Sequence, residues 1–152
     1  MRVRDIMTEN VQACHPDTDL AAVAKLMWDH DCGFVPVVDS TGALAGVVTD
    51  RDVCMATATR GLAPGRISAN QAMGSPVRAC MANDTLSSAL GVMKEFKVRR
   101  LPVIDSHGAL VGVLALNDLV LAAERTKRLA AREIVAALAG ICEHRSITPA
   151  AA

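Results

Sequence analysis

Apolar and polar positions follow two different rhythms along this chain. Apolar side chains recur at i, i+3, i+4 and i+7 from residue 20 to residue 27, which predicts an amphipathic helix. Residues 34–39 and 43–48 are β-rich runs joined by Asp-Ser-Thr-Gly, so they predict a hairpin. With a brief strand expected over 11–14 and a second helix over 49–57, the order of elements is β-α-β-β-α.

The same order of elements returns in the second half of the chain. Residues 5–54 align with residues 71–120 without a gap, and 16 of these 50 positions are identical. An internal repeat restricts the architecture before any single motif is weighed. Two copies are too few for a solenoid, so we expect two similar units packed face to face, which is an α+β fold.

The repeat also divides the chain into segments. We expect a first unit over residues 1–60, a linker rich in Gly and Pro over 61–66, and a second unit over 67–122. A further helical pattern predicts a long C-terminal helix over 123–145, which docks on the module or on a partner chain, or stands in solvent. Residues 146–152 are expected to be a disordered tail.

A strand-to-helix corner in the first unit carries the candidate chemistry. Thr49 ends the strand, and Asp52 lies in the first turn of the helix that follows. Free N–H groups at a helix N-terminus suit phosphate, and the two side chains could meet phosphate and ribose oxygens. Thr-x-x-Asp is also a capping box, so both readings stay open on these residues alone. The second unit keeps Asp118 but has Ala115 in place of the threonine.

Composition excludes several classes of function. Lys plus Arg and Asp plus Glu each number 16, so we expect no binding to nucleic acid or to a membrane surface. The longest apolar run, 134–142, is far shorter than the ~20 residues of a membrane span. Five cysteines form no CxxC motif and leave one unpaired, which favours a reducing, cytoplasmic location. Cys14 and Cys80 are repeat equivalents and are expected to be buried apolar residues.

Catalytic and metal-binding sets are not apparent in the sequence. The four histidines do not cluster at metal-ligand spacing. A nucleophile with an oriented base cannot be assembled from the pattern. We therefore predict that the chain is not an enzyme and has neither a metal nor a catalytic cofactor.

Three motifs carry a family resemblance: Val-Arg-Asp-Ile-Met-Thr from Val3, the strand over 34–39, and Gly-Val-Val-Thr-Asp-Arg-Asp over 46–52. With their second-unit counterparts, they make residues 3–122 resemble a tandem pair of CBS domains, the regulatory Bateman module. The resemblance implies pseudo-twofold symmetry and a homodimer. It also implies a signalling module that binds AMP, ADP, ATP, NAD or S-adenosylmethionine between the units. Binding would change conformation or assembly, which an unknown effector protein would read.

The resemblance also implies which residues bind the nucleotide. The first site would comprise Thr18, Gly33, Phe34, Val35, Pro36, Thr49, Asp50, Arg51 and Asp52. A second, weaker site would comprise Val98, Arg99, Arg100, Pro102, Asn117 and Asp118. It would be weaker because Ala115 lacks the hydroxyl, and one of the two arginines could be a solvated strand-edge charge instead of a phosphate ligand. The alternative function is a structural dimerisation module with a vestigial cleft.

Overall fold

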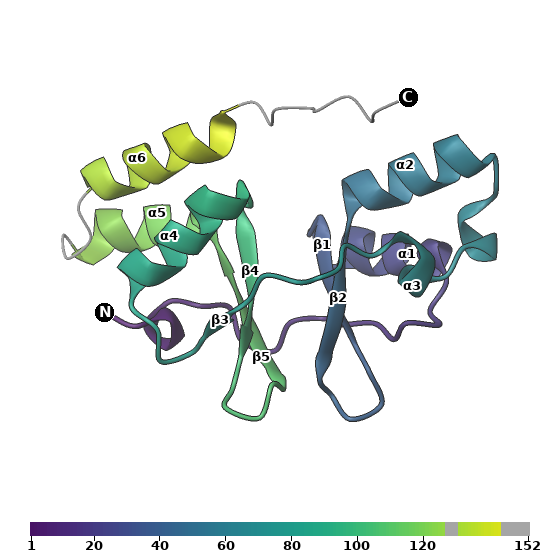
Figure 1. Cartoon of the computed structure of the whole chain (residues 1–152), viewed down its shortest axis with the longest axis horizontal. Coiled ribbons are helices and arrows are strands. Elements are labelled where there is room, and N and C mark those ends of the chain that lie inside the picture. The colour runs from purple at the N-terminus through teal and green to yellow at the C-terminus, as the bar shows by residue number, and fades with distance from the viewer. Residues whose placement is uncertain (127–130, 144–152) are drawn as a thin grey trace, which may run out of the picture.

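Two similar units lie side by side in a computed structural model that describes residues 1–126 and 131–143 (Figure 1). The first unit contains α1 (Leu20–Asp29), β1 (Phe34–Val38), β2 (Leu44–Thr49), α2 (Asp50–Arg60) and α3 (Ala69–Ala72), with a 3-10 turn at Pro64–Arg66. The second contains β3 (Cys80–Met81), α4 (Leu86–Phe96), β4 (Arg100–Ile104), β5 (Leu110–Ala115), α5 (Leu116–Thr126) and α6 (Ala131–Cys142). The two β-hairpins face each other in the middle, with helices outside them, so the predicted α+β fold is confirmed.

Both predicted hairpins are present and antiparallel. Strands β1 and β2 pair from Phe34 opposite Thr49, and β4 and β5 pair from Arg100 opposite Ala115. Each tip contains a glycine with positive φ, 83° at Gly42 in the first unit and 82° at its second-unit equivalent. The strand expected over 11–14 is reduced to one parallel bridge from Cys14 to β1, whereas β3 pairs in parallel with β4 over two residues.

The two units exchange short segments. The Thr8 N–H donates to the Val113 carbonyl of β5 at 2.9 Å, and the Gly74 N–H donates to the Val47 carbonyl of β2, also at 2.9 Å. Thr8 and Gly74 are equivalent positions of the repeat, as are Val47 and Val113, so the exchange obeys the repeat. Figure 1 shows the N-terminal chain beside the second unit before it crosses to the first. The boundaries near 60 and 67 stay a prediction, to which the packing adds this crossover.

Each unit has its own aliphatic core. Val3, from the N-terminal segment, belongs to the core of the second unit, whereas Ile67 belongs to the core of the first. Cys14 and Cys80 are buried, as predicted for small apolar residues. Burial raises the pKa of the Cys14 thiol to about 11 and that of the Cys80 thiol to about 12, with Asp84 adding to the second shift.

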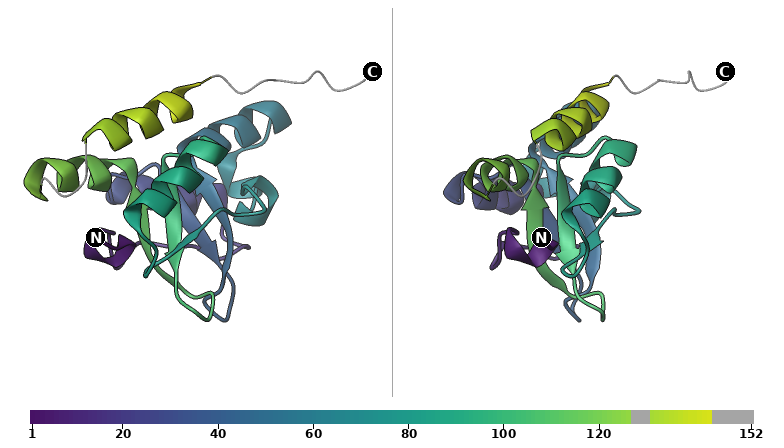
Figure 2. Two further views of the ribbon diagram at one scale, coloured as in Figure 1. Left: turned by 60° about the vertical axis from the view of Figure 1, so that its left-hand side comes forward. Right: turned by 90° about the vertical axis from the view of Figure 1, so that its left-hand side faces the viewer.

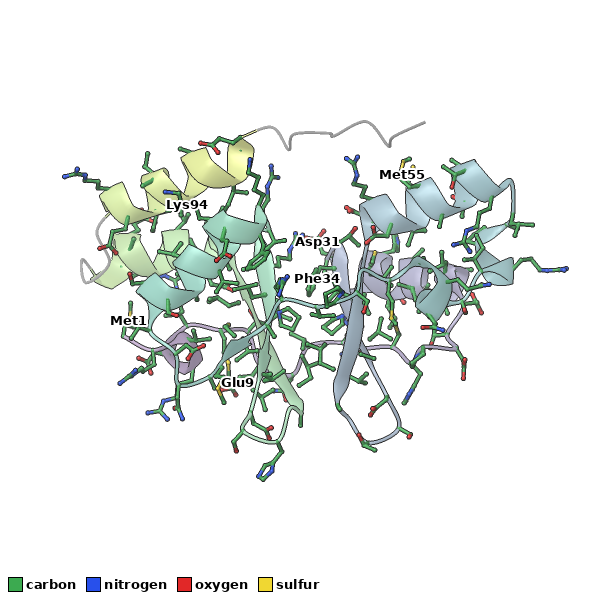
Figure 3. All side chains as sticks on the ribbon, in the orientation of Figure 1. Met1, Glu9, Asp31, Phe34, Met55 and Lys94 are labelled. Carbon is green, nitrogen blue, oxygen red and sulfur yellow. The ribbon has the colours of Figure 1, made fainter. Side chains whose placement is uncertain are left out.

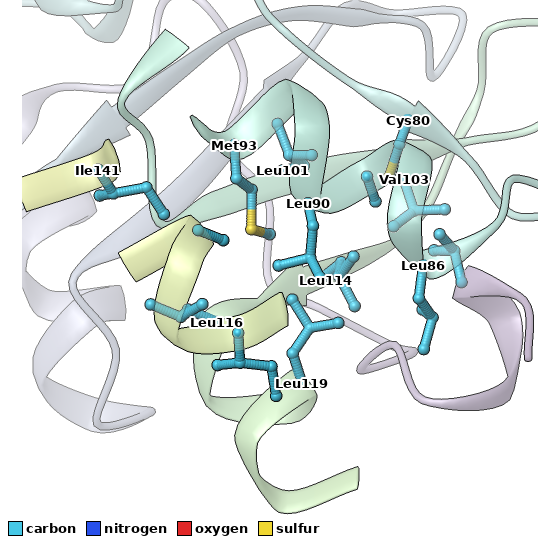
Figure 4. Close-up of a cluster of buried hydrophobic side chains, with 14 residues drawn as sticks. Cys80, Leu86, Leu90, Met93, Leu101, Val103, Leu114, Leu116, Leu119 and Ile141 are labelled. Atoms are coloured by element: carbon cyan, nitrogen blue, oxygen red, sulfur yellow. The ribbon is translucent and has the colours of Figure 1, made fainter. Parts of the chain in front are cut away.

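The C-terminal helix is present, and it docks on the second unit. Helix α6 contacts α4 and α5 (Figure 2), and its Ile134 and Ile141 enter the second core (Figure 4). The single helix predicted over 123–145 is instead two elements, α5 and α6, because α6 turns back to bury its apolar stripe on α4. The expected tail over 146–152 lies outside the described residues. None of the helices described here is long and apolar enough to cross a membrane.

Candidate functional site

The corner of the first unit forms a complete capping box. The Oδ2 atom of Asp52 accepts from the Thr49 backbone N–H at 2.8 Å and from the Thr49 hydroxyl at 2.7 Å. In return, the Thr49 Oγ1 atom accepts from the Asp52 N–H at 3.2 Å. The helix therefore uses the hydroxyl and one carboxylate oxygen of the pair that the sequence offered for nucleotide binding.

The equivalent corner of the second unit is simpler. The Oδ2 atom of Asp118 accepts from the Ala115 backbone N–H at 2.7 Å, and no hydroxyl completes the box. Burial raises the pKa of the Asp118 carboxyl, although the hydrogen bond from Ala115 opposes this shift. This carboxylate has fewer local partners than Asp52, which leaves more of its acceptor capacity for a ligand.

A cavity of about 260 Å³ lies between the two units, next to the Asp118 corner. It is lined by Thr8, Asn10, Val11, Gln12, His30, Cys32, Phe34, Arg100, Val113, Ala115 and Asp118. These residues come from the exchanged N-terminal segment, the chain between α1 and β1, and the hairpin of the second unit. Phe34 lies in the middle of the molecule, between the hairpins (Figure 3). The cavity joins one carboxylate and one guanidinium with apolar side chains.

The residues proposed for the second site are only partly brought together. Arg100 and Asp118 line the cavity, but Arg99 and Asn117 are exposed and do not line it. Val98 and Pro102 are more enclosed, and Val98 packs against the core of the second unit.

The residues proposed for the first site are dispersed. Phe34 lines the Asp118 cavity because Phe34 and Arg100 are repeat equivalents that begin facing strands. Val35 and Pro36 are buried in β1, and Arg51 is exposed on α2. The remaining members of the set lie elsewhere, as the next paragraph describes.

Gly33 and Asp50 line a different hollow, between α1 and α2. They lie close together: a Cβ atom on Gly33 would stand 2.6 Å from Asp50 Oδ2. The Thr18 hydroxyl oxygen accepts from the His15 N–H at 3.0 Å, and its carbonyl accepts from the Ala69 N–H at 2.7 Å. Thr18 thus helps to hold the exchanged segment.

The first-unit counterpart of the cavity has different side chains. In the repeat alignment, Arg78 takes the place of Gln12 and Phe96 takes the place of His30. The Arg78 guanidinium lies 4.0 Å from the centre of the Phe96 ring, which is a cation–π contact. Two positions that line the open cavity in one cleft are therefore engaged with each other in the other.

Several cavity residues were missed by the sequence analysis: Thr8, Asn10, Val11, Gln12, His30, Cys32 and Val113. Most of them reach the cavity because the N-terminal segment crosses to the second unit. The repeat aligned these positions but gave no signal that the segment crosses. Among the residues that the structure describes, no group of three or more His, Cys, Asp and Glu side chains could hold a metal ion.

The CBS domain family model matches residues 3–58 and 69–125. The chain belongs to the CBS domain family. This agrees with the two-unit fold and with the position of the cavity between the hairpins.

Individual relatives cover most of this CBS pair. The CBS domain-containing protein YhcV of Bacillus subtilis (strain 168) is 35% identical over 117 residues, which are 77% of this chain and 81% of YhcV. The crystal structure of Hypoxic Response Protein I with two coordinated zinc ions is 32% identical, with a TM-score of 0.74, covering 80% of this chain and 98% of that one. The crystal structure of CBSX2 in complex with AMP is 28% identical, with a TM-score of 0.72, covering 84% of this chain and 98% of that one.

Proposed function

We propose that this CBS pair is a regulatory module that binds an adenosine nucleotide in the cavity beside Asp118 and signals by a change of conformation or assembly. The observation that carries the proposal is the convergence of Asp118, Arg100 and Phe34 on one cavity between the units. The AMP complex of CBSX2 supports this class of ligand. A volume of about 260 Å³ is just below the roughly 300–1,000 Å³ of typical ligand pockets, so a small ligand suits it.

Each group has a role that follows from its chemistry. The Asp118 carboxylate accepts hydrogen bonds from the two ribose hydroxyls, and the Arg100 guanidinium pairs with phosphate. Phe34 and Val113 offer apolar surface to the base. The first turn of α5 begins at Leu116, beside this corner, and its free N–H groups favour an anion.

The geometry favours the Asp118 cleft over the Thr49 cleft, which reverses the order expected from the sequence. The hydroxyl that made Thr49 attractive is held by Asp52 at 2.7 Å. Arg78 and Phe96 contact each other in the first cleft, whereas their equivalents, Gln12 and His30, line the open cavity. The order of the two sites and the full residue sets stay proposals.

The first experiment identifies the ligand. Thermal unfolding is measured with AMP, ADP, ATP, NAD, NADH and S-adenosylmethionine. A ligand that binds only the folded chain raises the melting temperature, by about 2.7 kcal/mol of stability at a hundredfold excess over Kd. If none of the six raises it, the alternative of a structural dimerisation module with a vestigial cleft is favoured.

The second experiment locates the ligand by titration calorimetry. Asp118→Ala should weaken binding on the order of tenfold to a hundredfold, because a charge-assisted hydrogen bond is worth roughly 1.5–3 kcal/mol. Asp52→Ala is the matched control in the first unit. It should leave affinity unchanged but cost about 0.5–2 kcal/mol of stability through the lost cap. The opposite result would place the nucleotide at Thr49 and Asp52.

The remaining expectations are part of the same proposal. We propose that the chain acts as a sensor without catalysis, that it forms a homodimer, and that an effector protein reads its state. Relatives described as CBS-domain proteins, such as YhcV, support a role in regulation. The cytoplasmic location stays a prediction. Turnover of a bound nucleotide, followed by chromatography of the products, would contradict the sensor role.

A further inference from the structure

A second hollow opens on the outer helices of the first unit. It measures about 430 Å³ and is lined by Ala24, Met27, Trp28, Asp31, Cys32, Gly33, Asp50 and Val53. Trp28 stands at its edge with 87% of its surface exposed. Large exposed aromatic side chains are rare on monomeric proteins and mark surfaces that bind other proteins. We call the surface formed by this hollow and Trp28 the α1–α2 face.

The repeat reveals what covers such a face elsewhere in the molecule. Met27 is equivalent to Met93 and Val53 to Leu119, and these second-unit residues share a core cluster with Ile134 and Ile141 of α6 (Figure 4). The chain therefore has two equivalent helical faces but covers only the second with α6.

Contacts at the edge of α6 confirm the equivalence. Trp28 corresponds to Lys94, which lies between α4 and α6 in Figure 3, and a Cβ atom on Gly140 would come within 2.9 Å of its Cε atom. Asp31 corresponds to Lys97, whose Nζ atom lies 3.6 Å from a carboxylate oxygen of Glu143. Both equivalents of the first-unit residues are thus in contact with α6.

The α1–α2 face would repel a second copy of α6. Asp31 replaces Lys97, so a helix placed like α6 would bring Glu143 against a carboxylate. Asp50 adds a second acidic group where the second unit has Leu116. Like charges at such a contact are unfavourable.

The face complements itself instead. It holds both an apolar projection, Trp28, and a hollow large enough to receive one. Acidic Asp31 and Asp50 line the hollow, and exposed Arg51 follows Asp50 on α2. A twofold axis brings the same patch of two chains together, so projection meets hollow and base can meet acid.

We propose that the α1–α2 face is covered by the same face of a second copy of this chain, with Trp28 of each chain seated in the hollow of the other. This inference rests on the homodimer proposed above and names its surface, but it does not require nucleotide. Because α6 closes the equivalent face of the second unit, the assembly ends at two chains.

Sedimentation velocity of the full, ligand-free chain tests the proposal. The native chain should be a dimer at micromolar concentration. Trp28→Glu places a carboxylate against Asp31 and Asp50 and should raise the dimer dissociation constant on the order of thirtyfold, as expected for an interface hot spot. Since Trp28 is exposed, thermal unfolding of the variant should match that of the native chain at a concentration where both are monomeric.

Val135→Glu is the matched control, because Val135 is a helical apolar residue with 63% exposure on α6. It should leave the dissociation constant unchanged. Trp28 is the only tryptophan of the chain, so its fluorescence reports on the face directly. Its emission should shift to shorter wavelength as the native chain is concentrated through the dimerisation range.

The failures of the two proposals are distinguishable. A chain that stays monomeric at all concentrations overturns the homodimer itself. A dimer that resists Trp28→Glu, or that Val135→Glu weakens equally, overturns the face while the homodimer stands. A monomer whose Trp28 emission shifts on addition of a basic amphipathic peptide would assign the hollow to another protein and also overturn the proposal. Nucleotide binding is read separately by calorimetry.

Discussion

The two units share a fold but expose opposite surfaces. In the second unit α6 covers the outer helices, and the cleft beside Asp118 is open. In the first unit the outer helices are uncovered around Trp28, and the cleft contains the paired Arg78 and Phe96. Repeat positions thus dictate the backbone, whereas substitutions at those positions decide which surface is free to bind.

The largest expected effect tests the covered face of the second unit. Ile134 is 4% exposed beneath α6, so Ile134→Ala should lower the free energy of unfolding by about 2–5 kcal/mol. Its neighbour Val135 faces outward, and Val135→Ala should change stability by less than about 0.5 kcal/mol. Urea denaturation measures both. Equal losses would mean that α6 does not dock as described.

The second prediction compares the two segment crossings. A Cβ atom on Gly112 would lie 2.8 Å from the backbone carbonyl oxygen of Thr8, which the sheet holds in place, whereas one on Gly46 would meet the flexible Met73 side chain. Gly112→Ala should therefore cost about 1–3 kcal/mol, and Gly46→Ala should cost less. Chemical denaturation of both variants decides the order. A greater loss at Gly46 would contradict this account of the crossings.

The third prediction links the open cleft to the open face. His30 and Phe34 line the nucleotide cavity, Asp31 and Gly33 line the hollow, and Cys32 lines both. A ligand that moves this short segment should change the dimer dissociation constant by about fivefold or more, the lower end of typical coupling. Sedimentation with and without saturating AMP measures the change.

Reciprocity supplies the control for that coupling. By thermodynamic linkage, a dimer and a monomer must differ in AMP affinity by the same factor. Calorimetry on the native dimer and on Trp28→Glu provides the comparison. Equal dissociation constants with and without AMP would show that the segment lines both sites without connecting them.

The smallest expected effect concerns pH. Burial raises the pKa of Asp118, and a ribose diol donates to its ionised form, so protons compete with the ligand. Affinity should be full above this raised pKa and fall a few-fold as the pH drops toward about 5, earlier than for an ordinary aspartate near 3.9. Adenosine is the better probe, because a phosphate group titrates near pH 6. The Asp118→Asn variant should bind independently of pH, and a native profile equally flat would contradict the role.

The sequence by itself determined the local elements and their repetition. Helical and strand periodicity gave α1, β1 and β2 nearly at their observed bounds. The hairpins were predictable because Asp39 and Asp105 hydrogen-bond the turn backbone, which lowers the pKa of both carboxyls, and a glycine follows at the position of positive φ. The capping box at Thr49 was also visible, since its partners lie three residues apart.

Only the tertiary structure decided how the segments cross and what they enclose. The Thr8 and Gly74 segments each face two equivalent strands, β2 and β5, and local sequence does not distinguish these. The crossing brings Gln12 to Arg100 and Asp118 in one cavity, far apart in the chain. The position of α6 likewise depends on packing against α4, because an apolar stripe specifies that a helix is covered but not by which surface.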